Sequence, residues 1–540
     1  MSTQRSAGRI DYETLSTLLE NNDDSKKIHG ICECFLPQHE LKSLLEKTRV
    51  EATLKSHLFG DDIQAMSDYV LKRAPKTFLL LVYIDAVKNI GLLKDENFTD
   101  ENLSIESKST TNITALKANQ GGSTKPIGGK AHEFGSMHID NFFEKRWIFL
   151  VAEFQQAKFD YEFPQNYRLP FRFETSDKSK GNFGSVYQIG FRDAHSTPTT
   201  DKKGKFITVA LKQMSTDNNL TYNNVDKFYD RELTTLKTMR DMNHAHLIKA
   251  IASYKKGNDR CFLFPWADGG SLEALWKKNR GGFDKDLIPW AITQMTGLSE
   301  AIMKLHGKNT RHGDIKPANI LCFTEGNGSQ GYMTLKIADV GLAKVHEQYT
   351  RYRTKPTTTN HGTILYEPPE SDKYRRTIFD NPAETHDTIQ ERIISRKYDV
   401  WGLGCVFLEF IICLVKGYKE VAALRKDLTE NRLGGFWIQG GKLHGAVRRR
   451  IKMMVTLVKN DAALSDLMNL ITKKLLKTEK KGRIESEMLF KQMMRISSVC
   501  SGRSHISPSR LEGLTNQRAE TAESAREPNM PLSNQVTKPY

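Results

Sequence analysis

The pattern of hydrophobic and polar positions divides the chain into stretches of different period. Within residues 1–105, apolar residues recur three and four positions apart over residues 12–20, 41–54 and 65–93. This spacing gathers apolar side chains on one face of an α-helix. We therefore expect residues 1–105 to form a small, mainly helical accessory domain.

Two less regular stretches follow. Residues 106–131 are rich in Ser, Thr, Asn, Gly and Lys and offer almost nothing to bury, which predicts a flexible linker or insertion. Aromatic residues then cluster between residues 142 and 171 without a regular period. We expect residues 132–172 to form a strand-rich connector that packs on the following domain.

From residue 173 the pattern changes to β-branched stretches punctuated by glycine, and from about residue 272 to long helical periods. An α+β domain over residues 173–494, with a strand-rich lobe before a helix-rich lobe, is predicted. Residues 495–540 are basic and poor in apolar residues, so burial cannot compensate for the entropy lost on ordering. We expect a disordered tail there.

Composition supports an intracellular protein, cytoplasmic or nuclear. Hydrophobic residues make up 38% of the 540 residues, and the chain does not open with the basic and apolar regions of a secretory signal. The longest apolar runs, near Leu80 and Phe410, are shorter than the roughly 20 residues that a membrane span needs. We expect two buried helices and no transmembrane segment.

The charge of +16 would attract nucleic acid, anionic lipid or acidic proteins. The excess is spread over a long chain, and its densest run, residues 447–452, has helical spacing typical of a solvated face. Binding to nucleic acid or membrane is therefore the weakest alternative function. The seven cysteines lack paired CxxC spacing, which predicts reduced thiols and no structural zinc.

Residues suited to phosphate chemistry begin in the strand-rich lobe. Gly181 and Gly184 lie between strand-like segments, where a backbone without Cβ atoms can approach phosphates closely. Val186 would then lie under a nucleotide base, and Lys212 would direct its ammonium group at the phosphates. Alone, such glycines are typical of turns and such a lysine of a surface. Glu232, on the apolar stripe of the next helical pattern, would supply the counter-charge that a cleft-facing lysine needs.

A loop in the helix-rich lobe adds residues with separate tasks. Asp314 can orient a hydroxyl group and accept its proton, while Lys316 can neutralise a phosphoryl group in transfer. Asn319 and Asp339 supply an amide oxygen and a carboxylate, ligands that suit Mg²⁺ together with substrate phosphates.

In the order and spacing of these motifs, residues 173–494 resemble the eukaryotic protein kinases. The resemblance implies a bilobal fold and transfer of the γ-phosphoryl group of Mg·ATP to Ser or Thr hydroxyls of proteins, since Lys316 is similar to the lysine of the Ser/Thr branch. It implies that ATP binds to Ser179, Gly181, Gly184, Val186, Ala210, Lys212, Phe264 as gatekeeper, and the hinge residues Pro265, Trp266 and Ala267. It implies that catalysis rests on Lys212, Glu232, Asp314, Lys316 and Asn319, with Asn319 and Asp339 as metal ligands.

The same resemblance assigns structural roles around the activation segment, residues 339–370. Gly341 follows the metal-binding aspartate, and Thr363 supports the catalytic loop. Asp399 anchors the backbone of that loop, and Arg483 pairs with Glu370.

Several positions depart from the family pattern. Ser179 replaces a glycine, Val340 replaces a phenylalanine, and insertions at residues 192–205 and 371–390 can be looped out at little entropic cost. Gly313 replaces the arginine that reads a phosphate on the activation segment, and glycine cannot form those charge-assisted bonds. We therefore expect that phosphorylation of the threonines in this segment is dispensable, or that it acts through other cations. The threonines are Thr357, Thr358 and Thr359, and the other cations are Arg351 and Arg353.

Two functions remain open at this point: an active kinase, or a pseudokinase that binds nucleotide and serves as an interaction scaffold. Residues 142–154 resemble the leader that precedes kinase domains in some filamentous fungi. The sequence leaves undetermined the substrate and pathway, the upstream regulator, the role of the helical domain and the oligomeric state.

Overall fold

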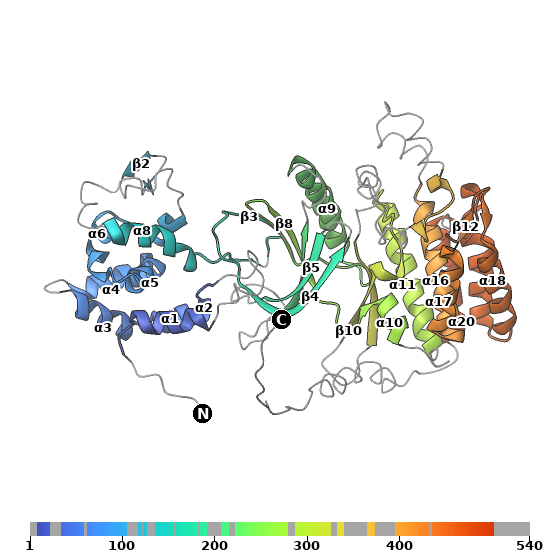
Figure 1. Cartoon of the computed structure of the whole chain (residues 1–540), viewed down its shortest axis with the longest axis horizontal. Coiled ribbons are helices and arrows are strands. Elements are labelled where there is room, and N and C mark those ends of the chain that lie inside the picture. Colours follow the sequence, from blue (N-terminus) through green and yellow to red (C-terminus); the bar gives the residue numbers. More distant parts are fainter. Residues whose placement is uncertain are drawn as a thin grey trace, which may run out of the picture. The chain divides into compact units, whose positions relative to one another are not determined.

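In a computed structural model, the protein forms two compact units. The first unit comprises residues 1–216 and 250–266, and the second comprises residues 217–249 and 267–540 (Figure 1). The described residues are 8–21, 34–58, 62–104, 117–120, 123–126, 136–155, 157–181, 184–191, 207–214, 222–278, 287–325, 332–339, 364–372, 395–430 and 435–501.

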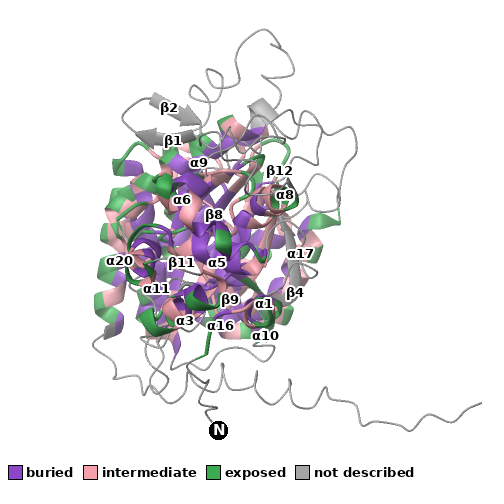
Figure 2. Ribbon diagram, turned by 90° about the vertical axis from the view of Figure 1, so that its left-hand side faces the viewer, coloured by how far each residue is buried: buried purple, intermediate pink, exposed green. Residues whose placement is uncertain are grey.

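Short helices form the beginning of the first unit, as the helical periods predict. They are α1 (Tyr12–Glu20), α2 (Gln38–Leu44), α3 (Lys47–His57), α4 (Ile63–Arg73), α5 (Pro75–Tyr83), η1 (Val87–Asn89), α6 (Ile90–Asp95) and η2 (Asp100–Ser104). Helix α5 lies in the core of these helices, since its side chains from Thr77 to Val82 are all buried (purple in Figure 2). The carboxylate of Asp100 accepts hydrogen bonds from the backbone of Lys76 and Thr77, so a distant residue caps this helix.

The two stretches expected to be a linker and a connector contain regular structure. Strands β1 (Lys117–Gln120) and β2 (Ser123–Pro126) pair antiparallel within residues 106–131. Helix α8 (Ser136–Lys145) and the 3-10 turn η4 (Arg146–Ile148) follow, and Phe142, Trp147 and Phe149 are buried in the core of the preceding helices. The first half of residues 132–172 is therefore helical and completes the helical core, because its aromatic side chains fill that core.

The second half of this stretch joins a six-stranded sheet. The strands are β3 (Asp160–Phe163), β4 (Phe171–Gly181), β5 (Gly184–Phe191), β6 (Ile207–Met214), β7 (Ala252–Lys256) and β8 (Asp259–Pro265), in the order β3-β7-β8-β6-β5-β4. Strand β3 pairs parallel with β7, and the other neighbours pair antiparallel. Residues before position 173 thus contribute an edge strand to the strand-rich lobe.

Side chains of this added segment cover one face of the sheet. Phe154 lies at the centre, with its ring centroid 5.0 Å from Tyr161, 5.3 Å from Phe191 and 6.2 Å from Tyr254. The same core contains residues of β5, β6 and β8 whose side chains alternate with those of the opposite face: Tyr187, Ile189, Val209, Leu211, Cys261 and Leu263. The side chains on the other face of the sheet are therefore not part of this aromatic core.

The second unit is mostly helical. Its elements before the central helix are α9 (Tyr222–Met242), β9 (Gly270–Ser271), α10 (Leu272–Lys278), α11 (Ile288–Gly307), η6 (Pro317–Asn319), β10 (Ile320–Glu325) and β11 (Tyr332–Ile337). The later ones are α16 (Lys397–Lys416), α17 (Tyr418–Thr429), β12 (Trp437–Ile438), β13 (Lys442–Leu443), α18 (Gly445–Leu457), α19 (Ala462–Leu470), η8 (Ile471–Leu475), η9 (Lys480–Gly482) and α20 (Ser486–Ser501). A strand-rich part followed by a helix-rich part confirms the expected α+β class.

Helix α16 forms the core of this unit. Every residue from Tyr398 to Leu414 is buried. Among the described residues it is the one helix long and apolar enough to cross a membrane, and 94% of its most apolar window is buried inside the protein. Packing within the protein therefore accounts for its composition.

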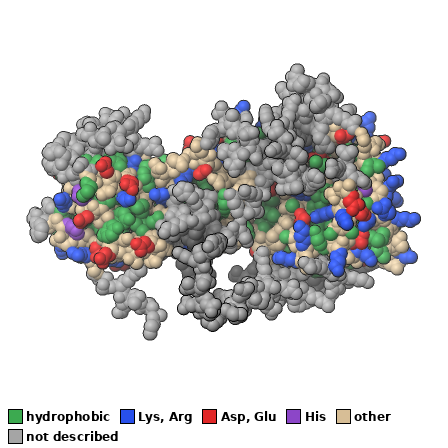
Figure 3. Space-filling model, viewed as in Figure 1, with side chains coloured by type: hydrophobic (Ala, Val, Ile, Leu, Met, Phe, Trp, Pro, Cys, Tyr) green, Lys and Arg blue, Asp and Glu red, His purple; other side chains and the backbone are tan. Residues whose placement is uncertain are grey.

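The last described helix and the basic run complete this unit. Helix α20 extends to Ser501 and buries Ile496 and Cys500, so ordered structure continues past the expected boundary at residue 495. Lys and Arg side chains gather at the right of Figure 3. Within the basic run, Arg448, Arg449 and Lys452 of α18 are exposed.

The packing of Phe154 generates a prediction. Phe154→Ala removes the ring at the centre of the aromatic cluster and should lower the free energy of unfolding of the first unit by roughly 3–5 kcal/mol. Chemical denaturation followed by near-UV circular dichroism measures this change. Met137→Ala, at a side chain that is 71% exposed, is the control and should leave stability unchanged. Equal stability of Phe154→Ala and the unaltered protein would show that the added segment is not part of this lobe.

Candidate active site

The residues expected to bind ATP lie on one face of the sheet in the first unit. Lys212 pairs with Val186 on one neighbouring strand, and Ala210 pairs with Phe264 on the other. Directly paired residues and residues two apart share a face, so all four belong to the face opposite the Phe154 cluster. Lys212 is buried, with a relative exposure of 6%.

A glycine is required where β5 approaches β6. A β-carbon at Gly184 would lie 2.0 Å from the backbone oxygen of Gln213, so a side chain cannot be accommodated without moving the strands. Gly184 also pairs with Gly181 at the end of the β4–β5 hairpin, and Ser179 pairs with Val186. This hairpin is the one predicted to close over phosphates. The hinge residues Pro265, Trp266 and Ala267 are half-buried and follow Phe264 at the end of β8.

Glu232 belongs to the second unit and lies in the buried stripe of α9. Its relative exposure is 2%, and Tyr229, Leu233 and Leu236 at helical spacing around it are buried too. A carboxylate in an apolar stripe is costly unless it has a partner. Its position is thus unlike that of a surface glutamate.

The catalytic loop is held together by its own side chains. The Nζ atom of Lys316 lies 2.8 Å from Oδ2 of Asp314. The amide nitrogen of Asn319 donates to the backbone oxygen and to Oδ2 of Asp314, both at 2.9 Å. Asp314 is buried and receives two donors on one carboxylate oxygen, which fixes the orientation of that group.

Asp399, at the start of α16, fixes the backbone of this loop. Its Oδ1 accepts a hydrogen bond of 2.7 Å from the Gly313 N–H, and its Oδ2 accepts one of 2.9 Å from the His312 N–H. The His306 ring lies 2.8 Å from the same Oδ2. Burial by itself would raise the pKa of Asp399, but the hydrogen bond and charge of His306 and the Gly313 N–H outweigh burial and hold this pKa below its usual value.

Gly313 adopts a left-handed backbone conformation, with φ at +78°. A residue with a Cβ atom is strained in this region, whereas glycine is not. Gly313, which stands in place of the usual arginine, therefore also avoids backbone strain in the turn. This turn brings two successive N–H groups to Asp399.

His312 links the loop to the predicted metal ligand. Its Nδ1 accepts a hydrogen bond from the Asp314 N–H, so its Nε2 carries the proton and donates to the Ala338 oxygen at 2.9 Å. Asp339 follows directly, with φ at +59°, a left-handed conformation uncommon for a residue with a side chain. The catalytic loop and Asp339 are thus fixed to each other within the second unit.

The donor set of the second unit fits a hard divalent cation. Asn319 uses its amide nitrogen toward Asp314, which assigns the amide oxygen as the group that remains to bind a metal. Asp339 supplies a carboxylate at the end of β11. No cluster of three or more His, Cys, Asp or Glu suited to a metal occurs among the described residues. Mg²⁺ commonly needs only one or two protein ligands besides phosphates and water, so this set is sufficient.

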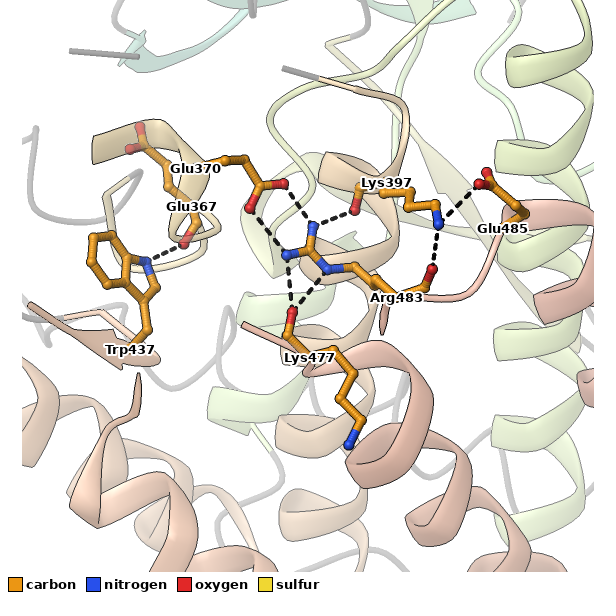
Figure 4. A network of polar contacts seen from close by, with 7 residues as sticks. All are labelled: Glu367, Glu370, Lys397, Trp437, Lys477, Arg483 and Glu485. Atoms are coloured by element: carbon orange, nitrogen blue, oxygen red, sulfur yellow. Dashed lines mark hydrogen bonds and ion pairs between the residues drawn. The ribbon is translucent and has the colours of Figure 1, made fainter. Parts of the chain in front are cut away.

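Arg483 ties the end of the activation segment to the core. Its guanidinium donates to both carboxylate oxygens of Glu370, at 2.8 and 3.1 Å, and to the Lys397 and Lys477 backbone oxygens (Figure 4). The side chain of Lys397 in turn donates to the Arg483 oxygen. Arg483 has a relative exposure of 1%, so its charge is balanced by buried partners.

The predicted residues are thus distributed over both units. The nucleotide-face residues, Pro265 and Trp266 belong to the first unit, and the remaining described residues belong to the second. Thr363, Gly341, the threonines 357–359, Arg351 and Arg353 lie outside the described residues, as does the side chain of Ser179.

Sequence reasoning assigned no role to several polar side chains that prove to be buried in this region. His306 and His312 contact the loop or its anchor, and Glu409 lies within the apolar run of α16. The sequence contained a sign of the role of Glu409, because this residue is the single charge in a run that is otherwise apolar.

Comparison with known proteins agrees with this geometry. The family model described as "Protein kinase domain" matches residues 180–494, more than half of the chain. An Aurora kinase of Yarrowia lipolytica is 30% identical over 232 residues, which cover 43% of this chain and 49% of that protein. The Pelle-like serine/threonine-protein kinase pik-1 of Caenorhabditis elegans is 26% identical over 266 residues, covering 47% and 48%. The serine/threonine-protein kinase BCK1/SLK1/SSP31 of Saccharomyces cerevisiae is 27% identical over 230 residues, covering 43% and 13%. The chain spans about half or less of the length of these relatives.

The anchor at Asp399 generates a prediction about stability and pH. Asp399→Asn places an amide where two backbone N–H groups and His306 need an acceptor, and each buried donor left unsatisfied costs about 1–3 kcal/mol. The variant should therefore be less stable than the unaltered protein in urea unfolding at neutral pH. Because the pKa of Asp399 is lowered on folding, its stabilisation is complete above its unfolded value of 3.8 and is lost as the pH falls through the lower folded value. The difference between the two proteins should shrink below pH 3.8, and a difference that stays constant there would contradict the charged anchor.

Proposed function

Because the chain belongs to the protein kinase family, we propose that it is an active Mg·ATP-dependent kinase that phosphorylates Ser and Thr hydroxyls of proteins. One observation carries the proposal: Asp314, buried in the catalytic loop, is oriented by Lys316 and Asn319, while Asp399 holds the loop backbone. The names of the three relatives, each of which contains "kinase", support the same class, and two of them specify serine/threonine.

The residues divide the work of an in-line phosphoryl transfer. Asp314 orients the acceptor hydroxyl and takes its proton as the oxygen bonds to the γ-phosphorus, and the bond from that phosphorus to the bridging oxygen of ADP breaks. Lys316 offsets negative charge that develops on the phosphoryl oxygens. Mg·ATP, when bound, supplies the phosphoryl group and part of that charge compensation.

The remaining residues bind and orient the nucleotide. Asn319 and Asp339 would hold the metal ion, and Lys212 would hold the phosphates. Val186, Ala210 and Phe264 would enclose the base, since they are apolar and share one face of the sheet.

A scaffold that binds nucleotide without transferring it is the competing function. Such a protein needs none of the groups that act on the hydroxyl, so it could lose them and still function as a scaffold. This chain retains Lys212, Asp314, Asn319 and Asp339. Their retention favours catalysis, and turnover decides between the two.

The residue at position 313 bears on whether activity depends on phosphorylation of the activation segment. A glycine has no side chain with which to bind a phosphate, and its φ of +78° suits the loop without strain. We infer that phosphorylation of the activation segment is not required for activity.

Turnover is the first test. With Mg·ATP and a generic basic protein substrate, Asp314→Asn should lower kcat by roughly 10²–10⁴ because the proton acceptor is lost. Lys212→Met should abolish transfer through loss of a phosphate contact. Lys452→Met, the same substitution at an exposed lysine of α18, is the control and should retain full activity. Bound ATP with no transfer by the unaltered protein would establish the scaffold instead.

The regulatory inference has a test of its own. Changing Thr357, Thr358 and Thr359 together to Ala should reduce activity less than about tenfold, or about 1.4 kcal/mol in activation free energy. Gly313→Arg should reduce it as well, since a side chain at this φ costs about 1–2 kcal/mol. Kinetics on phosphatase-treated protein measure both. A hundredfold loss in the triple variant would end the inference.

A further inference from the structure

A second carboxylate, Glu409, is buried in the central helix α16. Its relative exposure is 0%. Its Oε1 accepts a hydrogen bond of 2.8 Å from Nε of Arg425, and its Oε2 accepts one of 2.8 Å from Nη2 of the same arginine. The hydroxyl of Tyr366 donates to Oε2 at 2.9 Å. Both oxygens of a fully buried charge are thus bonded by groups from other elements.

The arginine comes from α17, the helix that follows α16 after Gly417. Besides Glu409 it contacts Glu273 of α10, with Nη1 3.2 Å from Oε1. Burial alone would lower the pKa of Arg425, but the charge and hydrogen bonds of Glu409 outweigh burial and raise it. Burial, with the charge of Glu409, raises the pKa of Tyr366 well above its usual value, so the phenol remains a donor. The arginine–glutamate pair is therefore bidentate and is joined to Tyr366 by the hydrogen bond that the phenol donates.

Tyr366 belongs to residues 364–372, which comprise the end of the activation segment and the two residues after it. Its ring centroid lies 5.9 Å from that of Phe436, whose N–H donates to the Leu365 oxygen. The Trp437 indole donates to the Glu367 oxygen at 2.8 Å, as Figure 4 shows. With Glu370 bound to Arg483, both ends of residues 364–372 are fixed to the helical core.

The helix α16 joins this anchor to the catalytic loop. Asp399 holds the loop at the first turn of α16, and Glu409 holds Tyr366 ten residues later. At a rise of about 1.5 Å per residue, the two anchors lie roughly 15 Å apart along the axis of one buried helix. The spacing between the catalytic loop and residues 364–372 is thereby set by a rigid element.

We propose that Arg425 is a positioning residue for phosphoryl transfer: through Glu409 and Tyr366 it holds the end of the activation segment in its working place without a phosphate. The arginine absent at position 313 would have joined the catalytic loop to a phosphorylated segment. Here an arginine on α17 binds the carboxylate that accepts the hydrogen bond from Tyr366 of the segment. The inference rests on the proposed kinase function for its effect on rate, but its structural part is measurable without activity.

Loss of the arginine has a defined consequence. Arg425→Met strands the Glu409 charge in the core, where an unpaired carboxylate is strongly unfavourable, so Glu409 must take up a proton or move. Either response disturbs the acceptor of the Tyr366 hydroxyl. Removing the charge as well, in Arg425→Met with Glu409→Gln, leaves an amide oxygen that can still accept from Tyr366.

The test combines hydrogen exchange with kinetics on the full chain. In Arg425→Met, amide protection of residues 364–372 should fall at least tenfold, and kcat should fall at least tenfold while the KM for ATP stays unchanged. The double variant should recover protection and most of kcat. Tyr366→Phe, which leaves the arginine–glutamate pair intact, should lower both as Arg425→Met does.

The matched control is Arg450→Met. Arg450, 14% exposed against 17% for Arg425, joins α18 to α17 through Glu420 and Asp427 but does not contact residues 364–372. It should alter neither protection nor kcat. Unchanged protection in Arg425→Met or Tyr366→Phe, an equal effect of Arg450→Met, or no recovery in the double variant would each overturn the proposal. The predicted exchange pattern in a protein that transfers no phosphate would uphold the anchor and overturn the kinase function alone.

Discussion

The second unit depends on a charge that is buried in its most apolar helix. The Asp399 carboxylate has a relative exposure of 0%, and its solvation by water is replaced by two backbone N–H groups and the His306 ring. Such an exchange is favourable only when every acceptor position is used, since an unpaired buried charge costs several kcal/mol. The position of the catalytic loop is thus determined by the need to satisfy Asp399. The lowered pKa of this group reports the same balance.

Alternation along strands organises the first unit in a comparable way. Val186, Ala210, Lys212 and Phe264 occupy one face of the sheet, so the residues between them must be covered from the other side. The segment around Phe154 provides that cover and adds an edge strand, and it leads directly from the helical core that Trp147 and Phe149 complete. Although the matched family region begins at residue 180, the fold of this lobe begins earlier.

The sequence could predict groups whose relationship is local. Asp314, Lys316 and Asn319 are within six residues of one another, and their spacing carries their chemistry. The buried stripe around Glu232 has a clear helical period. Residues 132–172 were expected to form a strand-rich connector because aromatic side chains favour strands in general, whereas residues 136–148 are helical and their aromatic side chains fill a helical core. The contacts of Glu409 with Tyr366 and Arg425 join positions 43 and 16 residues apart, and no local period encodes such pairs.

The glycine at position 313 is explained by the way in which residues 364–372 are held. An arginine there would cost backbone strain at a φ of +78° and would be useful only with a phosphate partner. The chain instead fixes residues 364–372 through charges that folding itself buries, in Glu409 with Arg425 and in Glu370 with Arg483. Buried pairs of this kind are screened little by salt and do not depend on an added group. Their presence makes the order of residues 364–372 a property of the fold.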